Sequence, residues 1–99
     1  MRVGRIVEAK ELPDARKPSY RLRIDFGPLG MRQSVAAART DYPEPQELVG
    51  RQVVCVLNLP PRRVAGVSSE VLVLAATEAS GTLRLLRPDS ESELGARIT

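Results

Sequence analysis

The chain has 99 residues, enough for one domain, with 15 Lys and Arg against 12 Asp and Glu. It has no histidine and one cysteine, so it lacks the commonest general base and metal ligand and cannot form an internal disulfide or a thiolate metal cage. We therefore expect a protein that is not an enzyme, with no catalytic residue, no metal site and no cofactor.

The first third of the chain predicts three strands. Residues 2–9 suit a strand, and a polar connection lies between Pro13 and Pro18. Residues 19–26 then alternate between polar and apolar side chains, and this period of two predicts a half-buried strand. A turn over 27–30 leads to a less regular third strand over 31–35. The expected inward-facing residues are Tyr20, Leu22, Ile24 and Phe26, and the outward-facing ones are Arg21 and Arg23.

A short helical insertion is expected after the third strand. Residues 36–39 could begin a helix, but Pro43 and Pro45 stop it, and residues 44–49 suit one helical turn ended by Gly50. Strands follow over 51–58, 70–76 and 82–86, with a basic loop over 62–69. This order of short strands predicts an all-β fold, a five-stranded OB-type barrel with the helical insertion between strands 3 and 4. Residues 1–99 form its single domain.

The longest apolar run, residues 53–57, has the length of a strand and falls far short of the ~20 residues of a membrane span. Met1 is followed directly by the charged stretch Arg2–Arg5, which does not match a secretory leader. We therefore expect no membrane insertion and a cytoplasmic location.

Two groups of reactive residues are interpreted as structural. Cys55 lies within the buried 53–57 strand, and no histidine is present to activate it as a nucleophile. Asp89, Glu91 and Glu93 suit a solvated acidic tail better than a metal site, which would need a turn that brings the oxygens together.

The stretch from Asn58 to Glu70 is the strongest candidate for binding. Pro60 and Pro61 stiffen the exit from a central strand, so Arg62 and Arg63 are presented with little entropy to lose. Paired arginines on a stiff loop suit phosphate oxygens. A Pro/Gly-rich turn with incidental arginines explains the same residues equally well, so the residues alone leave both interpretations open.

Three separated blocks resemble one family. They are Arg2–Val7, Asp25-Phe26-Gly27, and Asn58–Arg63 followed by Gly66 and Ser69. Together they resemble the tRNA-binding domain family, and the similarity runs from Arg2 to about Ile98. Within that family, residues 13–18, 24–27, 60–63 and 69–74 are most similar to the CsaA group, which is described as export-related molecular chaperones.

The resemblance implies an OB barrel that forms a homodimer and is not an enzyme. Family members bind tRNA by its shape, and the CsaA group is thought to bind unfolded or export-bound polypeptides. Where tRNA-binding members usually have Ser-x-Gly-Met, this chain has Ser69-Glu70-Val71-Leu72, as in the CsaA group. Residues that match the tRNA-contacting positions are Asn58, Arg62, Arg63 and Ser69, with Arg32 and Ser34 as a second match.

Two functions remain. The preferred one is a CsaA-like chaperone that binds unfolded or preprotein polypeptides as a homodimer and also has tRNA-binding capacity. The alternative is a structure-specific tRNA-binding protein. Generic single-strand binding is disfavoured, because the chain has only three aromatic residues for stacking bases. A dimer is expected even without the N-terminal helical segment of relatives, because the apolar runs need cover on their outer faces.

Overall fold

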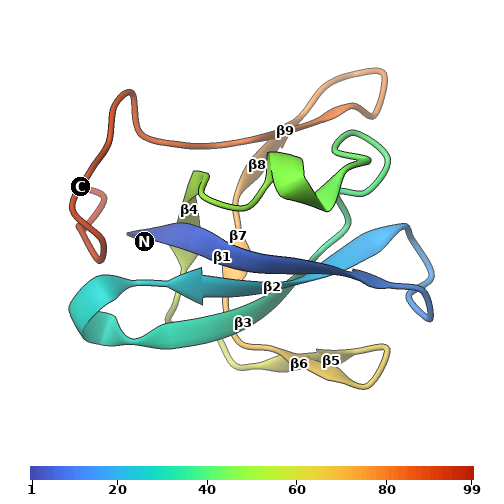
Figure 1. Ribbon diagram of the computed structural model, residues 1–99, viewed down its shortest axis with the longest axis horizontal. Coiled ribbons are helices and arrows are strands. Elements are labelled where there is room, and N and C mark those ends of the chain that lie inside the picture. The colour runs from blue at the N-terminus through green and yellow to red at the C-terminus, as the bar shows by residue number, and fades with distance from the viewer.

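The computed structural model describes residues 1–99 and shows a curled antiparallel sheet with two additional hairpins (Figure 1). The sheet has the strand order β3-β2-β1-β4-β7. Its strands are β1 (Arg2–Leu12), β2 (Ser19–Asp25), β3 (Met31–Ala36), β4 (Gln52–Val56) and β7 (Leu72–Val73). The hairpins are β5 (Arg62–Val64) with β6 (Val67–Ser69), and β8 (Ala75–Thr77) with β9 (Leu83–Leu85). This all-β arrangement is consistent with the predicted OB fold.

Three predicted elements differ in detail. The helical insertion is only a 3₁₀ turn, η2 (Pro45–Glu47), and a second 3₁₀ turn, η1 (Gly27–Leu29), follows β2. The basic loop over 62–69 is a short hairpin. The single strand expected over 70–76 is divided into β7 and β8, because the chain leaves β4 after Leu74 and then pairs with β9.

The alternating strand β2 has the predicted register. The side chains of Tyr20, Leu22, Ile24 and Phe26 are fully buried, whereas Arg23 is exposed and Arg21 is partly exposed. Gly4 of β1 faces the same interior, because an added Cβ would lie 2.6 Å from Ile24 Cγ2 and from Phe26 Cε1. The core therefore lies on the inner face of the neighbouring strands β2, β1 and β4, and Leu48, Val71 and Leu85 pack against that face.

Strand β1 pairs with two partners because it bends. Residues 2–5 pair with β4, and residues 5–12 pair with β2, with a bulge between Ile6 and Glu8. A bulge adds one residue to one strand and increases its twist, which lets a long strand wrap around a small barrel.

None of the helices has the length and apolar character that a membrane crossing requires.

The C-terminal segment is fastened along the start of β1 rather than free. The Gln52 side chain makes two hydrogen bonds to the Ser92 backbone, at 2.7 and 2.9 Å, and Arg5 forms an ion pair with Glu91. Farther on, Arg2 and Arg97 form an antiparallel bridge. Val3 and Val54, opposite each other on the outer face, are only 2% and 9% exposed. The segment is thus bonded to Val3 through Gly95 and Ala96, whereas the side chains of Asp89, Glu91 and Glu93 are exposed.

Candidate nucleic-acid interface

The two arginines of the candidate loop lie side by side on β5, and both are exposed. The turn between β5 and β6 consists of Ala65 and Gly66, both at positive φ (50° and 82°), as tight hairpins require. Arg63 donates a hydrogen bond to the Gly66 carbonyl at 2.9 Å, and Arg62 makes no hydrogen bond or ion pair. The hairpin thus presents two guanidinium groups to a ligand.

The hairpin is fastened to β3 largely through side chains. The Gln33 N–H donates to the Glu70 carboxylate at 2.7 Å, and the Val35 N–H donates to Ser69 Oγ at 3.2 Å. The Ser34 hydroxyl, which is fully buried, donates to the Val71 carbonyl at 2.6 Å. These bonds close the barrel between β3 and residues 69–71. The predicted site residues Ser34 and Ser69 therefore use their hydroxyls to hold the hairpin in place.

A basic groove of about 460 Å³ separates the hairpin from the connection between β1 and β2. Arg62 and Arg63 line one side of it, and Arg16 and Lys17 line the other. Asp14 is the only acid in its lining, and none of the four cations forms an ion pair. Sequence reasoning missed Arg16 and Lys17 as site residues, although their position between two prolines was a usable signal.

A second, smaller hollow of about 160 Å³ lies beside the hairpin, and Arg62 lines this hollow as well. Its lining is mainly aliphatic, with Leu59 46% exposed and Leu72 48% exposed. Glu70 also lines it, so both charge signs are present beside the apolar surface. The side chain of Arg62 thus lies between an apolar hollow and a basic groove.

Asn58 and Arg32, the remaining predicted residues, lie together in a third hollow, of about 390 Å³. Arg32 is opposite Ile24 in the register, so its side chain leaves β3 on the inner face of the sheet. This hollow does not include Arg62 or Arg63. The six residues expected to form one site are therefore divided among the basic groove, the two hollows and the hairpin attachment.

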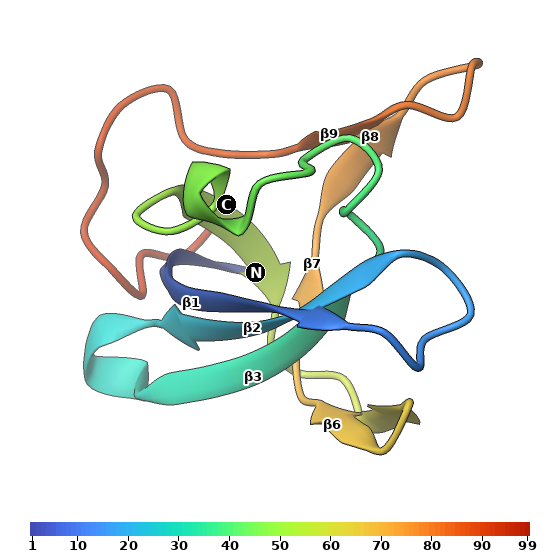
Figure 2. The ribbon, with the colours of Figure 1, turned by 45° about the vertical axis from the view of Figure 1, so that its right-hand side comes forward.

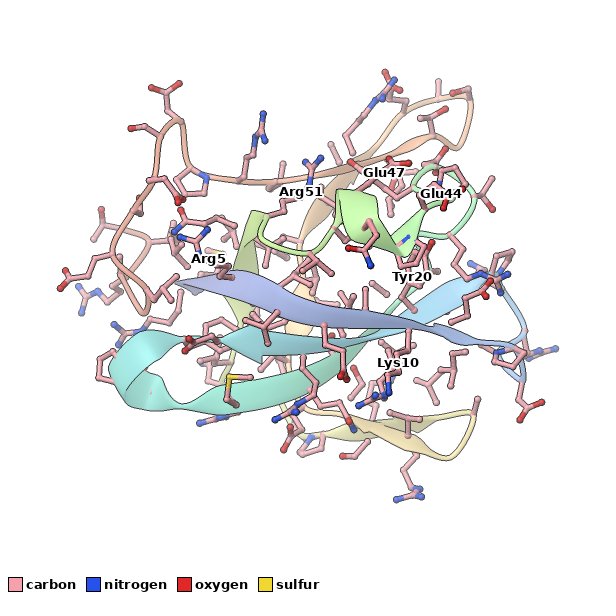
Figure 3. All side chains as sticks on the ribbon, viewed as in Figure 1. Arg5, Lys10, Tyr20, Glu44, Glu47 and Arg51 are labelled. Carbon is pink, nitrogen blue, oxygen red and sulfur yellow. The ribbon has the colours of Figure 1, made fainter.

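The buried ionisable groups are unsuited to catalysis. Burial raises the pKa of the Cys55 thiol to about 12, so the reactive thiolate does not form near neutral pH. Burial also raises the pKa of Tyr20, whose hydroxyl donates to the Tyr42 carbonyl at 2.7 Å. Figure 3 shows Tyr20 directed from β2 toward the η2 turn, near Glu44 and Glu47. No cluster of His, Cys, Asp or Glu could hold a metal ion.

The comparisons with known proteins agree with this architecture. A family model described as "Putative tRNA binding domain" matches residues 1–97. The chain belongs to the tRNA-binding domain family. The methionine–tRNA ligase of Porphyromonas gingivalis (strain ATCC 33277) is 42% identical over 98 residues. Those residues are 99% of this chain but only 14% of the ligase, so the chain spans a small part of such relatives.

Solved structures of this family include CsaA chaperones that match nearly the whole chain. The CsaA chaperone of Bacillus anthracis is 47% identical, with a TM-score of 0.90 over 99% of this chain and 88% of that one. The CsaA protein of Picrophilus torridus is 39% identical, with a TM-score of 0.88 over 99% and 89%. The resemblance to the CsaA group within the tRNA-binding domain family is thereby confirmed.

Proposed function

We propose that this protein is a CsaA-type chaperone that binds unfolded or export-bound polypeptides as a homodimer and also binds tRNA. The observation that carries the proposal is the position of Arg62, which lines both an aliphatic hollow and a basic groove. The aliphatic hollow suits a polypeptide and the basic groove suits RNA, so both ligands would contact the guanidinium group of Arg62. Both ligands occur in the cytoplasm, where we place the protein.

The aliphatic hollow supports polypeptide binding. At about 160 Å³ it is smaller than the ~300–1,000 Å³ of pockets that enclose whole small molecules, and it suits a single side chain. Leu59 and Leu72 extend the apolar surface beyond it. An unfolded chain offers aliphatic side chains that a folded protein hides, so such a surface selects unfolded polypeptides without requiring one sequence.

The basic groove supports RNA binding through phosphates. None of the four cations that line it forms an ion pair within the chain. A guanidinium group can donate two parallel hydrogen bonds to one phosphate. Tyr20 and Phe26 are fully buried, and the Tyr42 hydroxyl accepts a hydrogen bond from the Leu85 N–H of β9, so the chain offers no platform for stacking successive bases. Recognition of a folded RNA such as tRNA by its shape and phosphates fits this surface better than binding of a single strand.

A second copy of the chain would cover apolar side chains that one copy leaves exposed. The C-terminal segment already pairs with Val3, and Val54 is 9% exposed, so only some of the apolar side chains on the outer faces of the strands need a partner. Leu86, which lies outside the aliphatic hollow, remains 42% exposed. A homodimer would also place two basic grooves on one assembly. Light scattering at low micromolar concentration tests this, and a monomer mass would refute the dimer.

The ligand proposal is tested by measuring binding to bulk tRNA and to a denatured polypeptide at several salt concentrations. Replacing Arg62 and Arg63 with alanine removes two phosphate contacts. The slope of log affinity for tRNA against log salt should then become shallower by roughly 1.4–1.8. A matched control is Arg84→Ala with Arg87→Ala, which removes the same charge near β9, far from the hairpin (Figures 1 and 2).

The polypeptide arm uses Leu72→Ser, which makes the rim of the aliphatic hollow polar. This change should weaken binding of the denatured polypeptide and leave the salt slope for tRNA unchanged. Equal tRNA slopes in the hairpin and control variants would make Arg62 and Arg63 incidental surface charges. Polypeptide binding that is insensitive to Leu72→Ser would remove the hollow from the proposal.

A further inference from the structure

The third hollow is lined by three arginines that come from distant parts of the chain. Arg2 starts β1, Arg32 lies on β3, and Arg97 belongs to the C-terminal segment. No acidic residue lines the hollow, and none of the three arginines forms an ion pair. The positive charge gathered there is therefore not neutralised by the protein itself.

The backbone holds two of these arginines together. Arg2 and Arg97 are partners in an antiparallel bridge, which is supported by the hydrogen bond from the Ile98 N–H to the Met1 carbonyl at 3.0 Å. Like charges directly opposite each other destabilise a strand pair. Arg32 adds a third positive charge to the same hollow. An anion seated among the three groups would remove this repulsion.

The remaining lining suits a ligand larger than a simple anion. Leu29 and Leu57 supply aliphatic surface, and the exposed amide of Asn58 can both donate and accept hydrogen bonds. The volume of about 390 Å³ falls in the range of pockets that hold small organic molecules. Phosphate oxygens, an apolar ring face and a polar ring edge occur together in a nucleotide.

We propose that the hollow formed by Arg2, Arg32, Arg97 and Asn58 binds one unpaired nucleotide of an RNA. The guanidinium groups bind its phosphate, Leu29 and Leu57 contact the base, and Asn58 bonds to the base edge. This inference rests on the proposed RNA binding and adds a subsite to it. Asn58 and Arg62 are four residues apart and so at most about 14 Å from each other, which lets one RNA reach this hollow and the hairpin together.

The first experiment titrates the protein with adenosine, cytidine, guanosine and uridine 5′-monophosphates, followed by NMR or calorimetry. Arg32→Gln and Arg97→Gln should each weaken mononucleotide binding at least tenfold. Arg87→Gln, an exposed arginine outside the hollow, is the control for the loss of one charge and should change the affinity less than twofold. Circular dichroism establishes that the variants are folded.

Two further probes test the chemistry of the ligand. Inorganic phosphate should bind at least tenfold more weakly than the mononucleotides, because it leaves the leucines and Asn58 without a partner. Equal binding of inorganic phosphate would reduce the hollow to an anion site and overturn the nucleotide assignment. Tighter binding of N-acetyl-leucine than of any mononucleotide would assign the hollow to a polypeptide carboxylate instead.

Binding of bulk tRNA separates failure of this inference from failure of the proposed function. Arg62→Ala with Arg63→Ala should weaken tRNA binding but leave mononucleotide binding unchanged, because neither residue lines the hollow. If tRNA binds the unaltered protein and no mononucleotide does, the subsite is refuted and the RNA-binding surface stands. If neither binds, both proposals fail.

Discussion

The wall of the barrel, which consists of β1, β2 and β4, is stabilised differently from the β5–β6 hairpin. In the wall, β2 and the residue that follows it place Leu22, Ile24 and Phe26 completely out of water against β1 and β4. In the hairpin, no residue is fully buried, and attachment to β3 depends on hydrogen bonds from or to Gln33, Ser34 and Val35. Stability thus resides mainly in the wall, and the proposed ligand contacts reside mainly on the hairpin.

This separation means that the exposed arginines can be replaced without unfolding the protein. It also means that the hairpin's position depends on a few polar contacts, each worth only about 0.5–1.5 kcal/mol net. Changes in the wall should therefore alter stability strongly, and changes at the attachment should alter both stability and binding.

The largest effect is expected for Phe26→Ala in the wall. The ring is fully buried and packs against Gly4, which has no side chain to obstruct it. Removing the ring should lower the free energy of unfolding by about 3–5 kcal/mol in urea titrations. Arg23→Ala on the exposed face of the same strand is the control and should stay within about 0.5 kcal/mol. A cost below about 1 kcal/mol for Phe26→Ala would contradict the division between wall and hairpin.

A smaller effect is expected for Ser34→Ala at the attachment. The change removes the 2.6 Å bond to the buried Val71 carbonyl and leaves it only the longer bond from the Ser69 hydroxyl at 3.4 Å, at a cost of about 1–2 kcal/mol. Binding of tRNA should weaken as well, because the hairpin loses one of its attachments. The matched control is Ser68→Ala, since the Ser68 hydroxyl makes no hydrogen bond. Equal stability of the two variants would show that this bond does not hold the hairpin.

The pH dependence of stability tests burial in the wall. The thiol pKa of Cys55 is about 12 in the folded protein and near 9.0 when exposed, so the unfolded chain loses this proton first. The resulting stabilisation is fully present below pH 9 and decreases above it, by about 1.4 kcal/mol at pH 10. Tyr20, whose pKa is also raised, adds to the decrease only above about pH 10.

Urea titrations at pH 8 and pH 10 measure this effect, with Cys55→Ala as the variant that lacks it. The stability difference between the two proteins should shrink as the pH rises. A difference that stays constant would mean that the thiol is as accessible to hydroxide in the folded state as in the unfolded one.

The smallest effect is expected at the hairpin turn. Ala65 has φ 50°, a left-handed conformation that costs most residues about 1–2 kcal/mol but that asparagine tolerates better. Ala65→Asn should therefore raise the free energy of unfolding by a few tenths to about 1 kcal/mol. Ala79→Asn, at a turn residue whose own φ is not positive, should give no gain. A loss of stability in Ala65→Asn would exclude strain at this turn.

The wall could be predicted from the sequence because its signal is local. Alternation over residues 19–26 fixes which side chains face inward, and the structure has the same register. The hairpin was expected as a loop because its strands have three residues each and its turn is Ala-Gly rather than Asn-Gly. A helical turn was expected over 44–49, and the structure has a 3₁₀ turn over 45–47. The prolines at 43 and 45 are compatible with both conformations, so the sequence does not distinguish them.

The site was less predictable because it depends on contacts between distant segments. Arg62 and Arg63 could be singled out from neighbouring residues alone. Arg97 reaches the hollow of Arg32 and Asn58 only through its bridge to Arg2, which no local pattern encodes. Likewise, the role of Ser34 in closing the barrel depends on its register opposite Leu22, which turns its side chain inward.

The bridge between Arg2 and Arg97 has a practical consequence for handling the protein. It brings the two ends of the chain side by side, near each other in both ribbon views (Figures 1 and 2). A purification tag or fusion partner joined to either end of residues 1–99 would emerge next to the three-arginine hollow, where it would compete with the proposed nucleotide. Adjacent ends also favour circular permutation. A permutant that joins Ile98 to Met1 through a short linker and opens at the exposed Ser80-Gly81 turn would carry its tags far from that hollow.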